Sequence, residues 1–451
     1  AAWPKSTTSS ARQQEDKAVS ASNSCAAPAG DVTALPSAGP FARALRSDFI
    51  RQIAGTFGTR ILLLAIGLVT SVITARLLGP EGRGLFAVAT AFAALGMQFG
   101  NFGLHASNTY YVARDRSLLP ALLGNSLVIS FGVALPLTAL SFAIFRFWPH
   151  LAPVSGVLLL LVLVSIPFGL ATMLLQNLLL GIQRIRAYNA LDLAGRVAGL
   201  LCLALLLLYG SVTAETVFAA TLVVSVLTFA ASLALLKGSC VAPLTASAKL
   251  FRGNIHYGLK AYLAAFFSFL VMRSNLLLSN YLLSDEEVGL FSVGISLVEL
   301  ICIIPVTTGT ILFPRLTAIQ DGTERWRLAR RTAVIISCVM VAIVAVAAMV
   351  AESAIRVLFG NAFSPAAVSF QFLLPGVLAL STNTILNNYF ASVGMPMVTV
   401  YAPLIALPVG MLTTYLLVPS IGNVGASLGT TAACVVMLSI SLLYCLRRER
   451  A

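Results

Sequence analysis

The chain has 451 residues, of which 58% are hydrophobic and only 10% are charged, and its mean hydropathy is +0.93. Soluble globular domains carry about 25% charged residues, so this composition excludes a chain that covers itself with a water-exposed surface. The net charge is +13, but the basic residues lie in short segments between apolar runs and are not interleaved with aromatic residues. We therefore expect a membrane protein that contacts membrane lipids and no nucleic acid.

The first residues of the chain differ in composition from everything that follows. Residues 1–40 are rich in Ala, Ser, Thr and Pro and contain no apolar run long enough for a signal peptide. Segments with so little apolar content cannot bury enough surface to fold. We expect residues 1–42 to be a disordered cytoplasmic tail, and the sequence leaves open whether residues 1–40 are native.

Apolar segments occupy most of the remaining chain. An α-helix needs about 20 apolar residues to cross a bilayer, and twelve segments qualify. The sequence therefore predicts an all-α integral membrane protein with twelve transmembrane helices. The segments are 53–78, 84–111, 118–147, 154–181, 189–209, 213–236, 257–283, 288–314, 332–351, 363–390, 397–418 and 422–446.

The connections between these segments differ in charge. Every second connection is rich in Lys and Arg, as is the C-terminal tail 447–451, whereas the opposite connections offer only Arg83, Arg146 and Arg356 near their edges. Positive residues accumulate in cytoplasmic loops. We therefore expect both termini to be cytoplasmic, and we call the opposite end of the bundle the outer end.

One stretch of the chain occurs twice. Residues 77–95 and 282–300 share Leu, Glu, Gly, Phe and Val at matching positions, and six predicted spans lie between the copies. A repeat of this kind indicates two similar bundles related by an axis along the membrane normal. We expect six-helix bundles at 43–236 and 257–446 joined by a cytoplasmic linker at 237–256. The matched glycines, Gly84 and Gly289, are expected in tight outer turns with positive φ.

Three motifs connect the chain to a known family. They are ARLLGPEGRGLF at 75–86, NLLLSNYLLSDEEVGLFSV at 275–293 and LFGNAFSPAA at 358–367. In their order and spacing they resemble the polysaccharide flippases of the multidrug/oligosaccharidyl-lipid/polysaccharide exporter superfamily. The sequence departs from the family pattern at Asn275, where an Asp is common, and a neutral amide cannot titrate as a carboxylate does.

The resemblance implies a fold, a cargo and a location. The implied fold is a V-shaped pair of six-helix bundles in the bacterial inner membrane. The implied activity is transfer of undecaprenyl-diphosphate-linked oligosaccharide from the cytoplasmic to the periplasmic leaflet, for O-antigen, capsule or exopolysaccharide. The implied partners are this lipid-linked oligosaccharide and the polysaccharide polymerase machinery.

Ionisable residues inside predicted spans are costly and are candidates for function. Arg60 and Arg273 lie in the first and seventh spans, which are equivalent in the two halves and line the central cavity of the family's fold. Because a guanidinium offers a permanent charge and two parallel donors, this pair could clamp a diphosphate. Arg196 is a further candidate, and Asp192 and Glu299 are candidates for ion pairing or coupling.

Each of these residues also has a structural interpretation. Arg60 could extend to the cytoplasmic surface, and Arg196 could pair with Asp192 one helical turn earlier. Glu299 could be the internal partner of Arg273 on the adjacent helix. Four amides are candidates for binding the sugars or, alternatively, for hydrogen bonds between helices: Gln98, Asn101, Asn108 and Asn275.

We expect no cofactor, no metal and no enzymatic activity. The cysteines form no CxxC pair, the histidines have no metal-ligand spacing, and no glycine-rich phosphate loop is present. Three alternatives remain: a multidrug/cation antiporter or a lipid II flippase of the same superfamily, and a membrane polysaccharide polymerase. Cationic cargo is disfavoured because the first and seventh spans contain Arg but no Asp or Glu.

Overall fold

The computed structural model describes residues 40–210, 212–240 and 242–450, with side chains except at 40–61, 257 and 448–450. The chain divides into two compact units, Ala1–Phe57 and Gly58–Ala451. Of the predicted disordered tail at 1–42, residues 1–39 lie outside the described residues. Its last three residues belong to a helix that begins at Pro40, so the prediction is wrong for them.

Helices form almost the whole of the described chain. The first half contains α2 (Pro40–Asn101), α3 (Leu104–Arg114), α4 (Leu119–Leu127), α5 (Ala134–Phe147), α6 (Gly156–Gly181), α7 (Ile185–Leu208) and α8 (Ala214–Lys237). A π-helical turn (Val128–Val133) joins α4 to α5, and short 3₁₀ turns occur at Arg116–Leu118 and Pro149–Leu151. The second half contains α9 (Ala248–Ser279), α10 (Asp285–Ile301), α11 (Ile303–Ala318), α12 (Gly322–Phe359), α13 (Ala366–Ser392), α14 (Val398–Ile421) and α15 (Asn423–Arg450), with a 3₁₀ turn at Asn361–Phe363.

Among the described residues, eleven helical segments are long and apolar enough to cross a membrane. The sequence predicted twelve, and the difference lies in α2, which contains the first two predicted spans. These two spans are joined at a kink, where Gly79 has φ 67° and ψ −179° and is followed by Pro80. The second span is itself interrupted, because Phe102 and Gly103 have positive φ and separate α2 from α3.

The predicted linker at 237–256 is partly wrong. Helix α9 begins at Ala248, nine residues before the predicted seventh span. Ser247 caps it, since its hydroxyl accepts a hydrogen bond from the backbone N–H of Leu250 at 3.3 Å. A polar sequence with a good N-cap can extend a helix beyond its apolar part, which hydropathy alone does not reveal.

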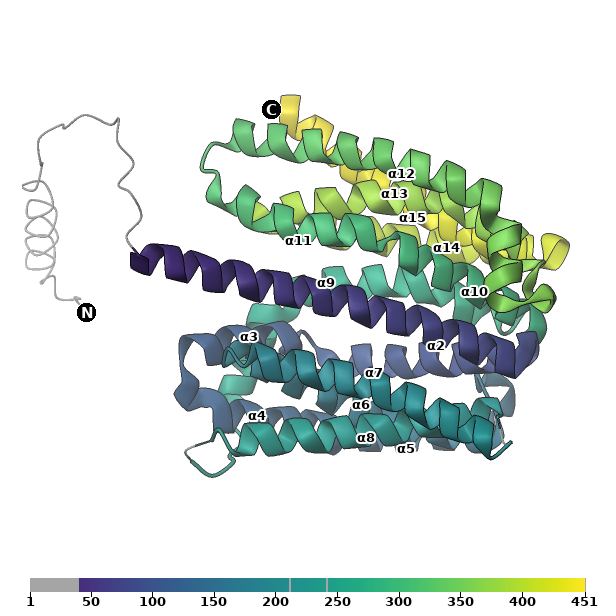
Figure 1. Cartoon of the computed structure of the whole chain (residues 1–451), viewed down its shortest axis with the longest axis horizontal. Helices are drawn as coiled ribbons and strands as arrows, with labels where there is room; N and C mark the ends of the chain where they lie inside the picture. Colours follow the sequence, from purple (N-terminus) through teal and green to yellow (C-terminus); the bar gives the residue numbers. More distant parts are fainter. Residues whose placement is uncertain (1–39, 211, 241, 451) are drawn as a thin grey trace, which may run out of the picture. The chain divides into compact units, whose positions relative to one another are not determined.

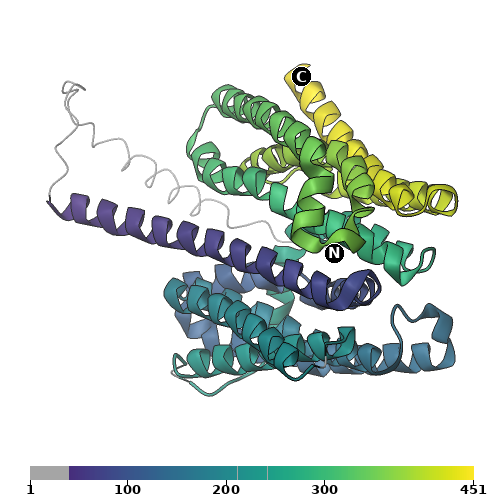
Figure 2. The same ribbon diagram turned by 45° about the vertical axis from the view of Figure 1, so that its right-hand side comes forward.

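The two halves have the same internal organisation. Helix α6, the fourth span of the first half, contacts α3, α4, α5, α7 and α8, and α13, the fourth span of the second half, contacts α10, α11, α12 and α15. These two helices are also the most buried of the candidate spans. Figures 1 and 2 show the helices of each half lying side by side, α4–α8 in blue and teal and α10–α15 in green and yellow. The arrangement agrees with the parallel repeat read from the sequence.

Helix α9 contacts both halves. It packs along α14 and α15 of its own half and along α3 and α4 of the first half. A large apolar cluster also crosses between the halves, with Val88 and Val162 of the first half packed among residues that include Leu276 and Phe291 of the second. Its apolar burial holds the two halves together.

The repeated glycines lie where the two copies of the repeat cross. A Cβ on Gly84 would meet the carbonyl oxygen of Asp285, and a Cβ on Gly289 would meet that of Pro80, both well under the 3.0 Å that real Cβ atoms keep. The expectation of positive φ at these positions is wrong, because it is Gly79 that adopts it. Gly84 and Gly289 are needed because the backbones of α2 and α10 approach too closely for any side chain.

Candidate functional site

Arg83 is a buried cation at the meeting point of three membrane helices. It follows the Gly79 kink by four residues, and only 8% of it is exposed. Its Nη2 donates hydrogen bonds to the hydroxyls of Ser71, in the first span, and Ser296, in α10, each at 3.1 Å. Its Nε is buried without a hydrogen-bond partner. A buried donor of this kind costs free energy unless a further acceptor arrives.

This placement corrects the sequence analysis, which assigned Arg83 to the edge of an outer connection. The two spans are two helical segments that meet at Gly79, whose backbone angles are not helical, so the turn between them is much shorter than the predicted connection. Helix continues through residues 80–84, and the side chain of Arg83 is thereby directed between the halves. A favourable contact with the ring of Phe86, 6.0 Å from the guanidinium carbon, helps to hold it.

Arg273 and Glu299 form an ion pair beside Arg83. The Nη2 atom of Arg273 in α9 donates to Oε1 of Glu299 in α10 at 2.6 Å. Arg273 lies six residues before the end of α9, about 9 Å of helix rise, and Glu299 lies fourteen residues after the start of α10, about 21 Å. These depths fall on either side of the middle of a hydrocarbon core about 30 Å thick. The pair is partly exposed, so it requires a polar surrounding at membrane depth.

These charged groups surround one cavity of about 170 Å³. Two guanidinium groups and one carboxylate give it a net positive charge. We call Arg83, Arg273 and Glu299 the arginine site. Its remaining lining residues are Phe86, Ala87 and Thr90 of α2, Leu276 of α9 and Ser292, Ile295 and Ser296 of α10.

The other predicted charged residues lie elsewhere. The side chain of Arg60 lies outside the described residues, so the proposed clamp between Arg60 and Arg273 stays a prediction. Arg196 pairs with Asp192 one turn earlier in α7, with Nε and Oδ1 3.4 Å apart. The guanidinium of Arg196 also reaches the first span, where a Cβ on Gly67 would lie 3.4 Å from it. The structure therefore places this pair on the first half, next to α2.

The predicted amides join helices to one another. Asn101 lies within 3.5 Å of the Gln98 side-chain oxygen and also contacts the ring of His105. Asn108 donates to the hydroxyl of Ser126 at 2.9 Å and accepts from Asn254 of α9 at 3.2 Å. The structure does not bring these amides to the arginine site.

Asn275 lies inside the second half. Its Nδ2 donates to the hydroxyl of Thr430 at 3.0 Å, and its Oδ1 accepts from that of Thr414 at 3.1 Å. The residue is 1% exposed and connects α9 to α14 and α15. Both ends of the amide are therefore engaged in helix packing, which an Asn can do without carrying charge.

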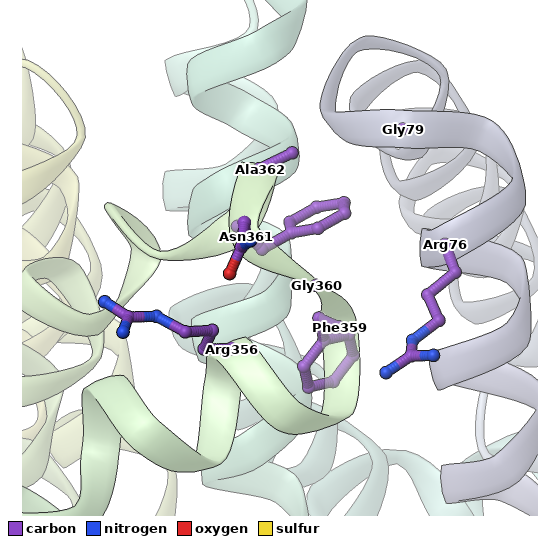
Figure 3. Close-up of a pocket in the computed structure, with 8 residues that line it drawn as sticks. Arg76, Gly79, Arg356, Phe359, Gly360, Asn361 and Ala362 are labelled. Atoms are coloured by element: carbon purple, nitrogen blue, oxygen red, sulfur yellow. The ribbon is translucent and has the colours of Figure 1, made fainter.

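A second contact between the halves lies at the outer end. Arg76 of α2 donates through Nε to the carbonyl of Leu358 at 2.7 Å and through Nη2 to that of Val357. It thereby caps the last carbonyls of α12, which have no partner inside their own helix. Figure 3 shows Arg76 across a surface pocket of about 380 Å³ from Phe359, Asn361 and Arg356.

No metal centre is found in the described part of the chain, where no group of three or more His, Cys, Asp or Glu residues could hold an ion. The described chain instead forms two repeat-related bundles of membrane-spanning helices that meet around a charged cavity at mid-depth. Together they define a multi-pass membrane transporter.

The sequence assigns this transporter to a family. Residues 73–368 match the model of the family described as "polysaccharide biosynthesis protein". The chain belongs to this family, as the motifs at 75–86, 275–293 and 358–367 indicated. Curated proteins give no significant match to the sequence.

Solved structures share the fold at low sequence identity. A multidrug resistance MATE family transporter of the MOP superfamily, in an inward-facing conformation, is similar with a TM-score of 0.68 at 15% identity, over 86% of this chain and 94% of that one. The lipid II flippase MurJ, in an inward closed conformation, has a TM-score of 0.68 at 12% identity, over 86% of both chains. A MOP superfamily transporter from Pyrococcus furiosus, whose binding pocket is described as having reverse polarity, has a TM-score of 0.57 at 14% identity, over 87% and 92%. These likenesses confirm the predicted all-α transporter fold.

Proposed function

We propose that this protein is a flippase for undecaprenyl-diphosphate-linked oligosaccharide and moves it from the cytoplasmic to the periplasmic leaflet. The observation that supports this cargo most directly is the net positive charge of the arginine site. A diphosphate is anionic and costly to bring to membrane depth, and guanidinium groups are the side chains best suited to hold it. Arg83 brings an unpartnered donor to the site, and Arg273 brings a charge that a diphosphate could share with Glu299.

The mechanism that we propose is alternating access. The diphosphate enters between the halves from the cytoplasmic end while the outer end is closed by the crossing of α2 and α10. It replaces Glu299 as the partner of Arg273 and takes up the Nε donor of Arg83. The lipid tail remains in the bilayer, and separation of the outer ends then releases the head group to the periplasmic side.

A multidrug/cation antiporter fits this site less well, because a cavity with two arginines and one glutamate repels cations. The lipid II flippase MurJ shares the fold, and its lipid-linked cargo makes lipid II the second candidate substrate for this chain. A membrane polysaccharide polymerase is less well supported, since the cavity holds a single carboxylate, Glu299, and this carboxylate is paired with Arg273. We place the protein in the bacterial inner membrane with both termini cytoplasmic.

The test is flipping in proteoliposomes that contain undecaprenyl-diphosphate-linked oligosaccharide or lipid II. A membrane-impermeant glycosidase reports how much sugar reaches the opposite face. We expect exposure of the oligosaccharide with the native protein and a loss of about tenfold in Arg273→Ala, because a hydrogen bond to a charged group contributes about 1.5–3 kcal/mol.

The matched control is Arg146→Ala, which removes an exposed arginine from the outer end of α5. It should flip at the native rate. Normal flipping by Arg273→Ala would refute the role of the arginine site. Flipping of lipid II alone would transfer the assignment to that cargo, and efflux of cationic dyes without flipping would favour the antiporter.

A further inference from the structure

A third and larger cavity lies in the second half, at the end predicted to be cytoplasmic. It has a volume of about 890 Å³, within the range of about 300–1,000 Å³ that small-molecule sites occupy. The start of α12 and the ends of α13 and α15 form its walls. We call it the aromatic pocket, and its lining residues are Asp321, Gly322, Thr323, Arg325, Trp326, Tyr389, Ser392, Val393, Tyr444 and Cys445.

Aromatic rings are built firmly into this pocket. The ring of Trp326 packs on that of Tyr389, with centroids 5.1 Å apart. Tyr389 is 6% exposed and packs on Phe390, which in turn packs edge-on against Tyr444 at 5.7 Å. A chain of packed rings keeps each side chain in one orientation, so the pocket offers preformed aromatic surface to a ligand.

The charged residues of the pocket are committed to the local backbone. The carboxylate of Asp321 accepts from the N–H of Thr323 at 2.9 Å and so caps α12. The guanidinium of Arg325 donates through Nε to the carbonyl of Ile319 at 3.0 Å and through Nη2 to the same oxygen. One negative and one positive group balance each other, so the residues that line the pocket carry no net charge.

Aromatic faces beside hydroxyl groups fit one chemical class of ligand. A sugar ring has apolar C–H faces, which pack on aromatic rings, and hydroxyl edges, which need hydrogen-bond partners. Thr323, Ser392 and Tyr444 bring hydroxyls to the pocket, and the hydroxyl of Ser392, which donates to the carbonyl of Tyr389 at 2.7 Å, can still accept a hydrogen bond. We propose that the aromatic pocket binds uncharged sugar residues of the cargo on the cytoplasmic side, before the diphosphate enters the arginine site.

This inference rests on the proposed function for the identity of the cargo, but it uses different residues. All walls of the aromatic pocket belong to the second half, so opening or closing between the halves need not disturb it. The pocket therefore supplies sugar recognition, and the arginine site supplies recognition of the diphosphate. The two contributions can be measured separately.

The experiment compares two probes bound to the full chain in nanodiscs: undecaprenyl diphosphate that carries a neutral oligosaccharide, and bare undecaprenyl diphosphate. Trp326→Ala should weaken binding of the sugar-bearing lipid about tenfold, as expected for loss of an aromatic contact surface, and leave binding of the bare lipid unchanged. Ser392→Phe, which fills the pocket from α13, should have the same effect. Trp148→Ala, at the exposed outer end of the first half, is the control and should bind both lipids as the native protein does.

Arg273→Ala should weaken binding of both lipids. If it weakens neither while Trp326→Ala still discriminates between them, the arginine site fails and the sugar pocket stands. If Trp326→Ala and Ser392→Phe both bind the sugar-bearing lipid as tightly as the native protein, the sugar pocket is overturned whatever Arg273→Ala does. Native thermal stability of each variant in detergent shows that it is folded.

Discussion

The two halves of the protein meet at two seams that differ in chemistry. The outer seam is the crossing of α2 and α10 at Gly84 and Gly289, and the inner seam is the contact of α3 and α4 with the start of α9. The inner seam also contains a close glycine pair, since a Cβ on Gly103 would lie 2.9 Å from the carbonyl oxygen of Gly258. At both seams, therefore, the backbones of the two halves come so close together that only glycine fits between them.

The inner seam is held together by hydrogen bonds of neutral amides. Asn125 donates to the carbonyl of Ser247 at 3.1 Å and accepts from its N–H at 2.9 Å, and Asn254 donates to Asn108. The outer seam combines an apolar cluster with two arginines, since Arg83 donates to Ser296 of α10 and Arg76 donates to the end of α12. Separation of the inner seam would leave buried amides without partners, whereas Arg83, on leaving Ser296 at the outer seam, would keep its hydrogen bond to Ser71. We therefore expect the start of α9 to move with the first half and the outer seam to open.

The largest effect on the difference between the two seams is expected from Gly84→Val. Its side chain would meet the backbone oxygen of Asp285, which cannot turn away as a flexible side chain could, so closure of the outer seam should be lost. Reversing the populations of two states, here outer seam closed and outer seam open, from 99:1 to 1:99 takes about 5.5 kcal/mol. We expect Gly84→Val to come close to this reversal. Spin labels at His150 and Asn361, in outer connections of the two halves, should report a longer distance, and flipping should stop.

The control for this variant is Gly199→Val in α7, where a Cβ would meet nothing within 4 Å. It should preserve both the spin-label distance and the flipping rate. A distance distribution in Gly84→Val equal to the native one would show that the outer seam tolerates bulk and is not the closing contact.

A smaller effect is expected from Arg83→Gln. This change keeps a hydrogen-bonding side chain between Ser71 and Ser296 but removes the charge and the buried Nε donor. Binding of bare undecaprenyl diphosphate in nanodiscs should weaken about tenfold, as loss of a charge-assisted hydrogen bond worth about 1.5–3 kcal/mol implies. Unchanged affinity in a folded variant would remove Arg83 from the binding site and reduce the arginine site to Arg273.

The smallest effect is expected at the inner seam, from Asn254→Ala. Hydrogen bonds between membrane helices contribute about 0.6 kcal/mol on average and at most about 1.7 kcal/mol, so thermal stability in detergent should fall modestly. The double variant with Asn108→Ala should lose less than the sum of the two single changes, because the two residues share one bond. If the stability losses of the two single variants add exactly in the double variant, the hydrogen bond between Asn254 and Asn108 does not stabilise the seam.

The sequence predicted the spans well and the helix ends poorly. Hydropathy located the apolar part of every candidate span, because a lipid-facing helix must be apolar over its whole length. It did not show that the first two spans meet at Gly79 with almost no connection between them or that α9 begins at Ala248. These features depend on a kink and a cap, which change few residues and leave mean hydropathy almost unaltered.

The candidate site was predicted in part. Arg273 and Glu299 were found because a charge in an apolar run is visible in sequence, and the structure pairs them. Arg83 was missed because it stands in a polar motif, PEGRGLF, that reads as a loop. A signal was nevertheless present, since Arg83 directly precedes the repeated Gly84, and the repeat marks where the halves cross.

By itself, the sequence determined the membrane-spanning all-α fold, the division into two repeated halves and the family, because each is fixed by local composition or by similarity between segments. Only the tertiary structure decided which charges share a cavity, why Gly84 and Gly289 are glycine and how the two seams differ. Those properties arise between residues about 200 positions apart. Their proximity depends on how helices cross and on where a kinked helix directs a side chain, and no local pattern encodes it.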